Sequence, residues 1–156
     1  MNLANLIDSH SVLRSLKAQN KKQLLQELAH AASTVTGVDQ RIIFETLFQR
    51  EKLGSTGLGA GIAIPHGKLK ALSKVHGLFA RLATPIEYES VDGQPVDLVF
   101  LLLAPEQAGA DHLTALAKIS RLLRDREFAA KLRGTDTSEG LYAILTEPSA
   151  SASHAA

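Results

Sequence analysis

GSTGLGAGIAIPHGK, residues 54–68, joins a glycine-rich turn to a short apolar strand and a histidine. The segment Ile62–Ile64 has the character of a strand. Pro65 lacks the backbone donor that a strand needs, so we expect the hydrogen-bond ladder to end there. His66 is then expected just outside the sheet, at the point where a strand stops.

A histidine in this position could act as a nucleophile, because a rigid strand would aim its ring. Gly67 would let a phosphate or another backbone come close. Lys68 adds a cation that either attracts a phosphate or is simply solvated. Most histidines in globular domains are partly buried hydrogen-bonding residues or surface residues, whereas polar residues on glycine-rich loops are more often functional. The residues alone leave both interpretations of His66 open.

Two known phosphate-binding motifs do not fit this segment. The glycines of residues 57–61 lack the spacing of the dinucleotide fingerprint and lead into a strand instead of a helix. Gly67-Lys68 is not part of a P-loop, because the earlier glycine would fall on Ile62 and Leu69 replaces the Ser/Thr.

The composition predicts one soluble globular domain. The chain has 156 residues, a net charge of +1 and no cysteine, which excludes disulfides and Cys-based zinc sites and gives no case for nucleic acid as a partner. The longest apolar run, residues 99–104, is far shorter than the ~20 residues that span a bilayer. The N-terminus lacks a signal-peptide pattern. We therefore expect a cytoplasmic protein that does not insert into a membrane.

The periodicity of apolar residues predicts an α/β fold, a single-domain mixed β-sheet flanked by helices. Residues 96–103 are apolar almost without interruption, as in a central strand buried on both faces. We expect the domain to span residues 1–147 and the low-complexity residues 148–156 to be disordered. The other expected strands are 12–16, 62–64, 76–82 and 86–88, and the expected helices are 21–36, 39–52, 111–123, 127–132 and 138–145.

The segment REKLGSTGLGAGIAIPHGKL, residues 50–69, resembles the active-site signature of enzyme IIA proteins of the phosphotransferase system (PTS), mannitol/fructose class. Within that class the chain is most similar to the nitrogen-regulatory type. The resemblance covers residues 3–147 and includes QPVD at 94–97 and DHL at 111–113. It implies the type-2 IIA fold and makes His66 the phosphoryl acceptor. Ala60 departs from the pattern, because relatives often carry a polar or acidic residue there.

Other residues are candidates for receiving the charge of a phosphoryl group. His112, with Asp111 as a possible cap, is predicted at a helix N-terminus and is otherwise a surface residue. The resemblance makes it the second active-site histidine. Arg50 either binds phosphate through its planar fork or stabilises a helix C-terminus; the resemblance favours the first. The backbone of the glycine loop could form an anion-binding nest or a plain turn. The phosphate-cradling candidates are Ser55, Thr56, Gly57, Gly59, Gly61, Gly67 and Lys68.

The resemblance implies a phosphocarrier that is phosphorylated by an HPr-like phosphohistidine protein and needs no cofactor or metal. Since no IIB or membrane domain is fused to the chain, we expect the regulatory type, whose targets belong to nitrogen and potassium control, such as potassium transport or sensor-kinase proteins. One alternative is a sugar-PTS IIA component that passes phosphate to a IIB protein. The others are a metal hydrolase using His66, His112 and Asp111, and a binding module without phosphate chemistry. The oligomeric state and the modified ring nitrogen stay open, although the family suggests Nε2.

Overall fold

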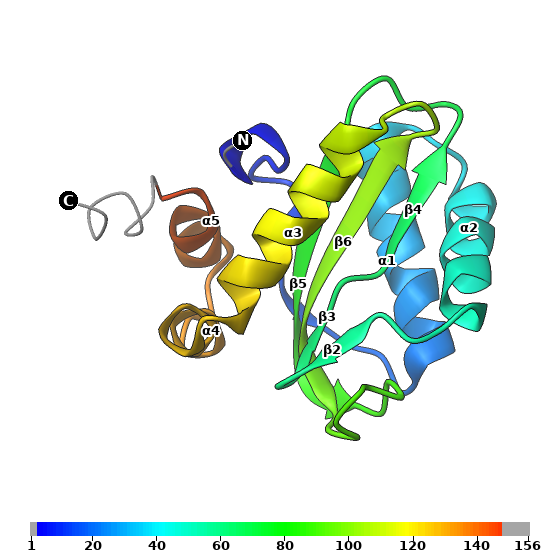
Figure 1. The fold of residues 1–156 in the computed structure, drawn as a ribbon. Helices are drawn as coiled ribbons and strands as arrows, with labels where there is room; N and C mark the ends of the chain where they lie inside the picture. The colour runs from blue at the N-terminus through cyan, green and yellow to red at the C-terminus, as the bar shows by residue number, and fades with distance from the viewer. Residues whose placement is uncertain (1–2, 148–156) are drawn as a thin grey trace.

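A computed structural model describes residues 3–147, which form a mixed sheet between two layers of helices (Figure 1). The tail 148–156, expected to be disordered, lies outside the described residues. The helices follow the chain as η1 (Leu3–Asn5, a 3-10 turn), α1 (Lys21–Thr36), α2 (Gln40–Lys52), α3 (Ala110–Arg124), α4 (Arg126–Arg133) and α5 (Ser138–Thr146). The strands are β1 (Val12–Leu16), β2 (Gly57–Gly59), β3 (Ile62–Ala63), β4 (His66–Leu69), β5 (His76–Ile86) and β6 (Val96–Pro105).

Strand β6 is the centre of the sheet. It pairs antiparallel with β5 along one side and parallel with β3 and then β4 along the other. The strand order is β1-β5-β6-β3-β2, with β4 beside β6. Parallel pairing of β1 with β5 and antiparallel pairing of β2 with β3 complete a mixed sheet, which confirms the predicted fold class.

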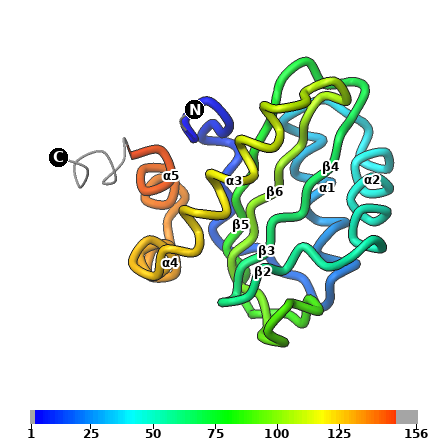
Figure 2. The backbone as a smooth tube through the Cα atoms, viewed as in Figure 1, coloured from blue at the N-terminus to red at the C-terminus, as the bar shows by residue number. Residues whose placement is uncertain are grey.

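Alternate residues of β6 face opposite helical layers, as the uninterrupted apolar pattern predicted. Phe100 and its neighbours two positions away pack with α3, α4 and α5. Leu101 and its neighbours two positions away pack with α1 and α2. Figure 2 shows the same arrangement, with α1 and α2 on one face of the sheet and α3 crossing the other. Helices therefore cover both faces of the sheet. A reactive side chain of the sheet is expected to reach solvent at the end of a strand.

The starts of the first two long helices agree with their sequence signals. The side chain of Asn20 accepts a hydrogen bond from the N–H of Gln23, and that of Asp39 accepts one from Arg41. Gly37 ends α1 in the left-handed conformation, with φ of 78°. These caps place the C-terminal turn of α2 immediately before the glycine-rich segment.

The sheet does not end at Pro65. The missing N–H of Pro65 interrupts the edge next to β6, but its carbonyl accepts a hydrogen bond from Leu102 at 3.0 Å. His66 then starts β4 and pairs with Leu102. The expectation that His66 lies outside the sheet is wrong, because proline removes a donor and leaves its acceptor in place.

Two other expectations about strands are also corrected. Residues 57–59, predicted as part of a turn, form β2 and pair with β3, so the turn is confined to residues 60–61. The strand predicted at 76–82 continues to Ile86 as β5, with an irregularity between Arg81 and Ile86, and of the second strand predicted at 86–88 only Ile86 lies in a strand. The kink lies beside Pro85, which cannot donate to a ladder.

Candidate functional site

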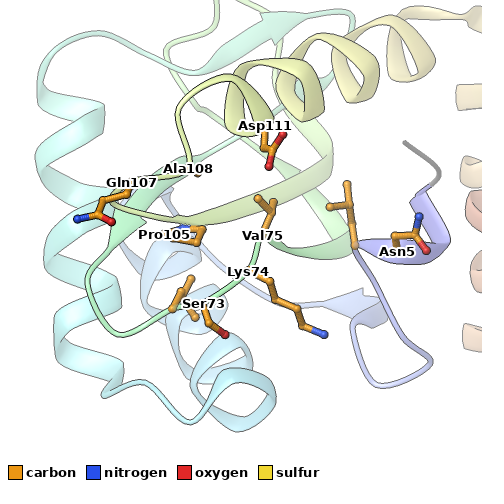
Figure 3. A pocket seen from close by; sticks show the side chains of 10 residues that line it. Asn5, Ser73, Lys74, Val75, Pro105, Gln107, Ala108 and Asp111 are labelled. Carbon is orange, nitrogen blue, oxygen red and sulfur yellow. The ribbon is translucent and has the colours of Figure 1, made fainter.

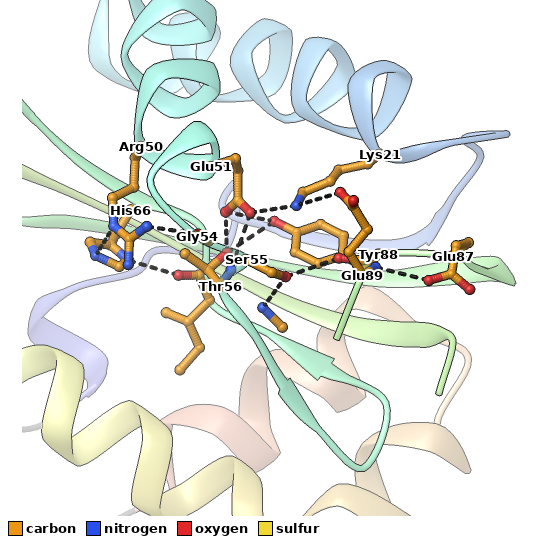
Figure 4. A network of polar contacts seen from close by, with 12 residues as sticks. Lys21, Arg50, Glu51, Gly54, Ser55, Thr56, His66, Glu87, Tyr88 and Glu89 are labelled. Atoms are coloured by element: carbon orange, nitrogen blue, oxygen red, sulfur yellow. Dashed lines mark hydrogen bonds and ion pairs between the residues drawn. The ribbon is translucent and has the colours of Figure 1, made fainter. Parts of the chain in front are cut away.

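His66 is half-buried at the start of β4, and both of its ring nitrogens have a defined partner. Nδ1 lies 2.9 Å from the carbonyl oxygen of Ile64, and Nε2 lies 3.2 Å from Nε of Arg50 (Figure 4). A carbonyl only accepts and a guanidinium only donates. Nδ1 therefore carries the proton, and Nε2 presents its lone pair.

Arg50 comes from the last turn of α2 and reaches the histidine across the start of the glycine segment. Its NH1 donates to the carbonyl of Gly54 at 2.8 Å while its Nε donates to His66. The guanidinium is thus held by a protein carbonyl on one side and points at the imidazole on the other. Arg50 therefore lies both at the helix C-terminus and beside His66. That it binds phosphate stays a prediction.

His112 lies next to His66 and comes from α3. The ring centroids are 5.6 Å apart and the planes are inclined by 49°. His112 is 6% exposed, and its Nε2 has no hydrogen-bond partner within residues 3–147. The cap of α3 is Gly109 instead of the expected Asp111, which lies inside the first turn. The two predicted histidines are therefore adjacent.

A cavity of about 470 Å³ opens over these side chains. Arg50, His66 and His112 line it, together with Gly67 and Lys68, so five of the predicted site residues meet there. Leu53, on its rim, is 85% exposed. The cavity therefore places the imidazole of His66 beside two cations, Arg50 and Lys68, and beside the apolar side chain of Leu53.

Burial lowers the pKa of His66 below its ordinary value. The hydrogen bond that His66 donates to the carbonyl of Ile64 and the charge of Glu51 oppose this lowering of the pKa, whereas Arg50 adds to it. Burial also lowers the pKa of His112, with further lowering by His66 and Lys68. Both imidazoles are therefore unprotonated near neutral pH, which a nucleophilic nitrogen requires.

The predicted glycine nest is not at this cavity. A Cβ on Gly59 would meet the carboxylate of Asp92 at 3.1 Å, and one on Gly61 would meet NH2 of Arg133 at 2.5 Å. Gly57 packs as closely against Ser90. The structure therefore offers no support for these glycines as a phosphate cradle, because β2 and its turn pack against side chains of the protein itself.

Gly67 has a different role from the one expected. A Cβ there would lie 2.6 Å from Cγ2 of Thr46 on α2. The absent side chain lets α2 approach β4, and this contact brings Arg50 close to His66. Gly67 still lines the cavity, but helix packing is what requires a glycine.

The departure at Ala60 is explained by its backbone contacts. Ala60 has a φ of 57°; its N–H donates to Asp92 at 2.9 Å, and its carbonyl accepts from Arg133 at 2.7 Å. Arg133 also forms a two-pronged contact with Asp97, at 2.8 and 2.9 Å. The turn is held through main-chain atoms, so a polar side chain at position 60 is not needed for it.

Ser55 and Thr56 are also engaged elsewhere. The hydroxyl of Ser55 donates to the carbonyl of Tyr88 at 2.9 Å. Thr56 is 5% exposed and its hydroxyl contacts Glu51 and Tyr88. Both residues serve a buried network instead of the cavity.

Glu51 is the residue of this region that our sequence analysis missed. It continues the buried stripe of Ile43 and Leu47 on α2 at a spacing of four residues. A carboxylate at an apolar position, in the helix turn that disfavours negative charge, was the available signal.

A larger cavity of about 710 Å³ lies next to the same end of α3 (Figure 3). Asp111 lines it, whereas the neighbouring His112 lines the smaller one. Its charged residues are Lys74 and Asp111, and it contains no histidine. The nucleophile and the cations that could receive phosphate belong to the smaller cavity.

Residues 5–147 match the family described as "Phosphoenolpyruvate-dependent sugar phosphotransferase system, EIIA 2". The chain belongs to this family. Among the IIA proteins it resembles is a nitrogen regulatory protein of Bradyrhizobium diazoefficiens, which is 57% identical over 152 residues, or 97% of this chain and 99% of the relative. A nitrogen regulatory protein of Escherichia coli is 36% identical over 148 residues, covering 94% and 91% of the two chains.

Solved structures agree with this IIA fold. The crystal structure of the nitrogen regulatory protein IIA-Ntr from Neisseria meningitidis superposes with a TM-score of 0.87 at 34% identity, covering 92% of this chain and 99% of that one. The mannitol IIA of Escherichia coli superposes with a TM-score of 0.73 at 20% identity, covering 88% and 97%, and is evidence for the fold alone.

Residues 3–147 contain no group of three or more His, Asp or Glu side chains placed to hold a metal ion. None of the helices in the same range is long and apolar enough to cross a membrane.

Proposed function

We propose that this IIA protein is a regulatory phosphocarrier that accepts a phosphoryl group on Nε2 of His66 from an HPr-like phosphohistidine protein. The observation that carries the proposal is the bonding of the ring. Ile64 holds the proton on Nδ1, so the lone pair is on Nε2, and His66 lines the cavity together with His112. Nε2 is thus the nitrogen that can form the new bond.

The transfer step needs no proton movement at His66. The lone pair of Nε2 attacks phosphorus and forms an N–P bond. The N–P bond of the donor phosphohistidine breaks, and its electron pair returns to the donor imidazole. Nδ1 keeps its proton throughout and donates it in a hydrogen bond to the carbonyl of Ile64. Such a reaction depends mainly on positioning and on charge stabilisation.

Three side chains are placed to receive the phosphoryl oxygens, which bring roughly two negative charges at neutral pH. Arg50 can turn its fork from the ring nitrogen to those oxygens. Lys68 is exposed at the cavity wall. His112 has a buried Nε2 with no protein partner in residues 3–147, and in the Nε2–H tautomer it can donate to an oxygen.

The regulatory part of the proposal is that the two phosphorylation states bind different target proteins. Relatives with 57% and 36% identity are named nitrogen regulatory proteins. The added charge would appear beside Leu53, which lines the cavity and is 85% exposed. An anion at an apolar rim changes which partner surface fits there. Potassium transport or sensor-kinase proteins in the cytoplasm are the proposed targets.

Onward transfer to a IIB protein is the second candidate. A fructose-specific EIIABC component of Bacillus subtilis is 30% identical over 148 residues, with this chain covering 23% of that protein. A phosphorylated chain that loses its label to a IIB partner faster than to water would favour this role over the regulatory one.

The test is incubation of the purified chain with a phosphorylated HPr-type donor, followed by intact-mass analysis. The wild type should gain one phosphoryl group, and His66→Ala should gain none. His30→Ala is the matched control, because His30 is an exposed histidine on α1 and should leave labelling unchanged. Labelling of His66→Ala at the wild-type level would reject the proposal. Pull-downs with the two states would then identify the targets.

A further inference from the structure

A buried ionic cluster is centred on Glu51, the residue after Arg50 in α2, and none of its members lines the cavity. Its members are Lys21, Glu51, Thr56 and Tyr88 (Figure 4). The side chain of Glu51 is 5% exposed and its carboxylate accepts from all three of the others. Lys21 contributes the positive charge at 2.8 Å, and Tyr88 is fully buried.

The carboxylate of Glu51 fixes the position of Thr56 through two bonds. Oε1 accepts from the N–H of Thr56 at 3.1 Å, and Oε2 accepts from its hydroxyl. Tyr88 donates to the same Oε2 at 3.1 Å. A charged acceptor makes these hydrogen bonds stronger than neutral ones. Thr56 is therefore held at both its main chain and its side chain.

The segment that contains Thr56 fixes both carbonyls that orient the site, because it contains Gly54 and is hydrogen-bonded to Ile64. The carbonyl of Thr56 accepts from the N–H of Ile64 at 3.1 Å, and the carbonyl of Ile64 holds Nδ1 of His66. Two residues before Thr56, the carbonyl of Gly54 holds NH1 of Arg50. One short segment thus orients the nucleophile and the cation beside it.

We propose that Glu51 is a positioning residue for phosphoryl transfer, which acts through the 54–56 segment to hold His66 in its Nδ1–H tautomer and Arg50 against Nε2. The inference deepens the proposed function, since it concerns the same site. Burying a carboxylate in α2 is costly unless it is fully paired. The ion pair with Lys21 offsets that cost. The paired carboxylate then fixes the geometry of His66 and Arg50, the two side chains that must contact the phosphoryl group.

The first test is NMR of the protein without any donor. The wild type should show a slowly exchanging Nε–H of Arg50 and ring nitrogen shifts that report the Nδ1–H tautomer of His66. Glu51→Gln should lose the slow exchange and show a mixture of tautomers. Arg133→Met is the control, because it breaks another partly buried ion pair, with Asp97, and a contact with the Ala60 carbonyl, whereas neither Arg133 nor Asp97 lines the cavity. Both signatures should persist in Arg133→Met.

The second test is the rate of phosphoryl transfer at saturating donor. Glu51→Gln should lower that rate about tenfold with little change in KM, because the misplaced groups act on phosphorus and not on donor docking. Arg133→Met should transfer at the wild-type rate. Failure of the wild type to accept phosphate would reject the proposed function, whereas the NMR test would still decide the role of Glu51.

Thr56→Val and Thr56→Ser make the inference testable even where Glu51→Gln does not fold. Valine removes the hydroxyl that Glu51 holds and serine keeps it, so only the valine variant should lose the Arg50 and His66 signatures. The inference is overturned if folded Glu51→Gln or Thr56→Val keeps both signatures and transfers phosphate as fast as the wild type.

Discussion

The Nε–H of Arg50 points at Nε2 of His66 over 3.2 Å, so the guanidinium covers the lone pair that a phosphoryl group must reach. The same guanidinium is tethered to the carbonyl of Gly54 through NH1. Arg50 must therefore release the ring nitrogen as phosphorus approaches, while its tether keeps it within reach of the phosphoryl oxygens. The contact between Arg50 and His66 favours the uncharged imidazole, and it keeps a cation close to the position where the phosphoryl group will add negative charge.

Substitution of Arg50 should have two measurable effects. In Arg50→Ala the pKa of His66 should rise, because the guanidinium charge helps to lower it. The rate of phosphoryl transfer should fall by about tenfold to a hundredfold, because a cation aimed at the transferred group is lost. An NMR titration and a transfer assay measure the two effects. Lys52→Ala, which removes a cation of the same helix turn outside the cavity, should change neither.

His112 should stabilise the phosphorylated state more than it speeds the attack. In His112→Ala the phosphoryl group on His66 should hydrolyse about tenfold faster, because a hydrogen bond from a buried donor to a charged oxygen is lost. The half-life of the phosphorylated protein, followed by intact mass, measures this. His30→Ala controls for the loss of a histidine, and an unchanged half-life in His112→Ala would contradict the role.

Acidification should destabilise the fold through its buried histidines. Burial lowers the pKa of His66, His76 and His112, whereas an unfolded histidine titrates near about 6.5. The folded state then binds fewer protons between the two values, so stability is complete above about pH 6.5 and is lost as the pH falls through the lowered values. Urea unfolding over a pH series should show this decline, and His112→Gln should make it shallower. Stability that increases on acidification across this window would contradict the pKa directions.

Gly67→Ala should weaken the packing of α2 on β4. The added Cβ would lie 2.6 Å from Cγ2 of Thr46, so the helix must shift. We expect a loss of about 1–3 kcal/mol in the free energy of unfolding, together with slower phosphoryl transfer. Thr46→Ser removes the clashing methyl group, so the double variant should recover most of both losses. No recovery in the double variant would show that the clash is not the cause.

Much of the fold follows from local patterns. The sequence predicted the apolar run that forms β6, the caps Asn20 and Asp39, and the three C-terminal helices. These features depend on the burial pattern and capping of residues that are close together in the sequence. Errors lie around Pro65, where β2 and β4 were predicted as turn and strand end, and around Pro85, where β5 was divided in two. Short strands that contain Gly and Pro have weak local signals. β3 and β4 pair with β6 through residues far away in the sequence, Ile62 with Leu98 and His66 with Leu102.

The sequence by itself determined the family, the central strand and the group of candidate residues from which the cavity is built, His66, His112 and Arg50 among them. Only the tertiary structure decided the tautomer of His66, the reason for Gly67 and the place of Glu51. The physical reason is that each of these depends on atoms brought together across the sheet. A hydrogen-bond partner or a clash is a property of packed neighbours, and residue spacing along the chain does not record it.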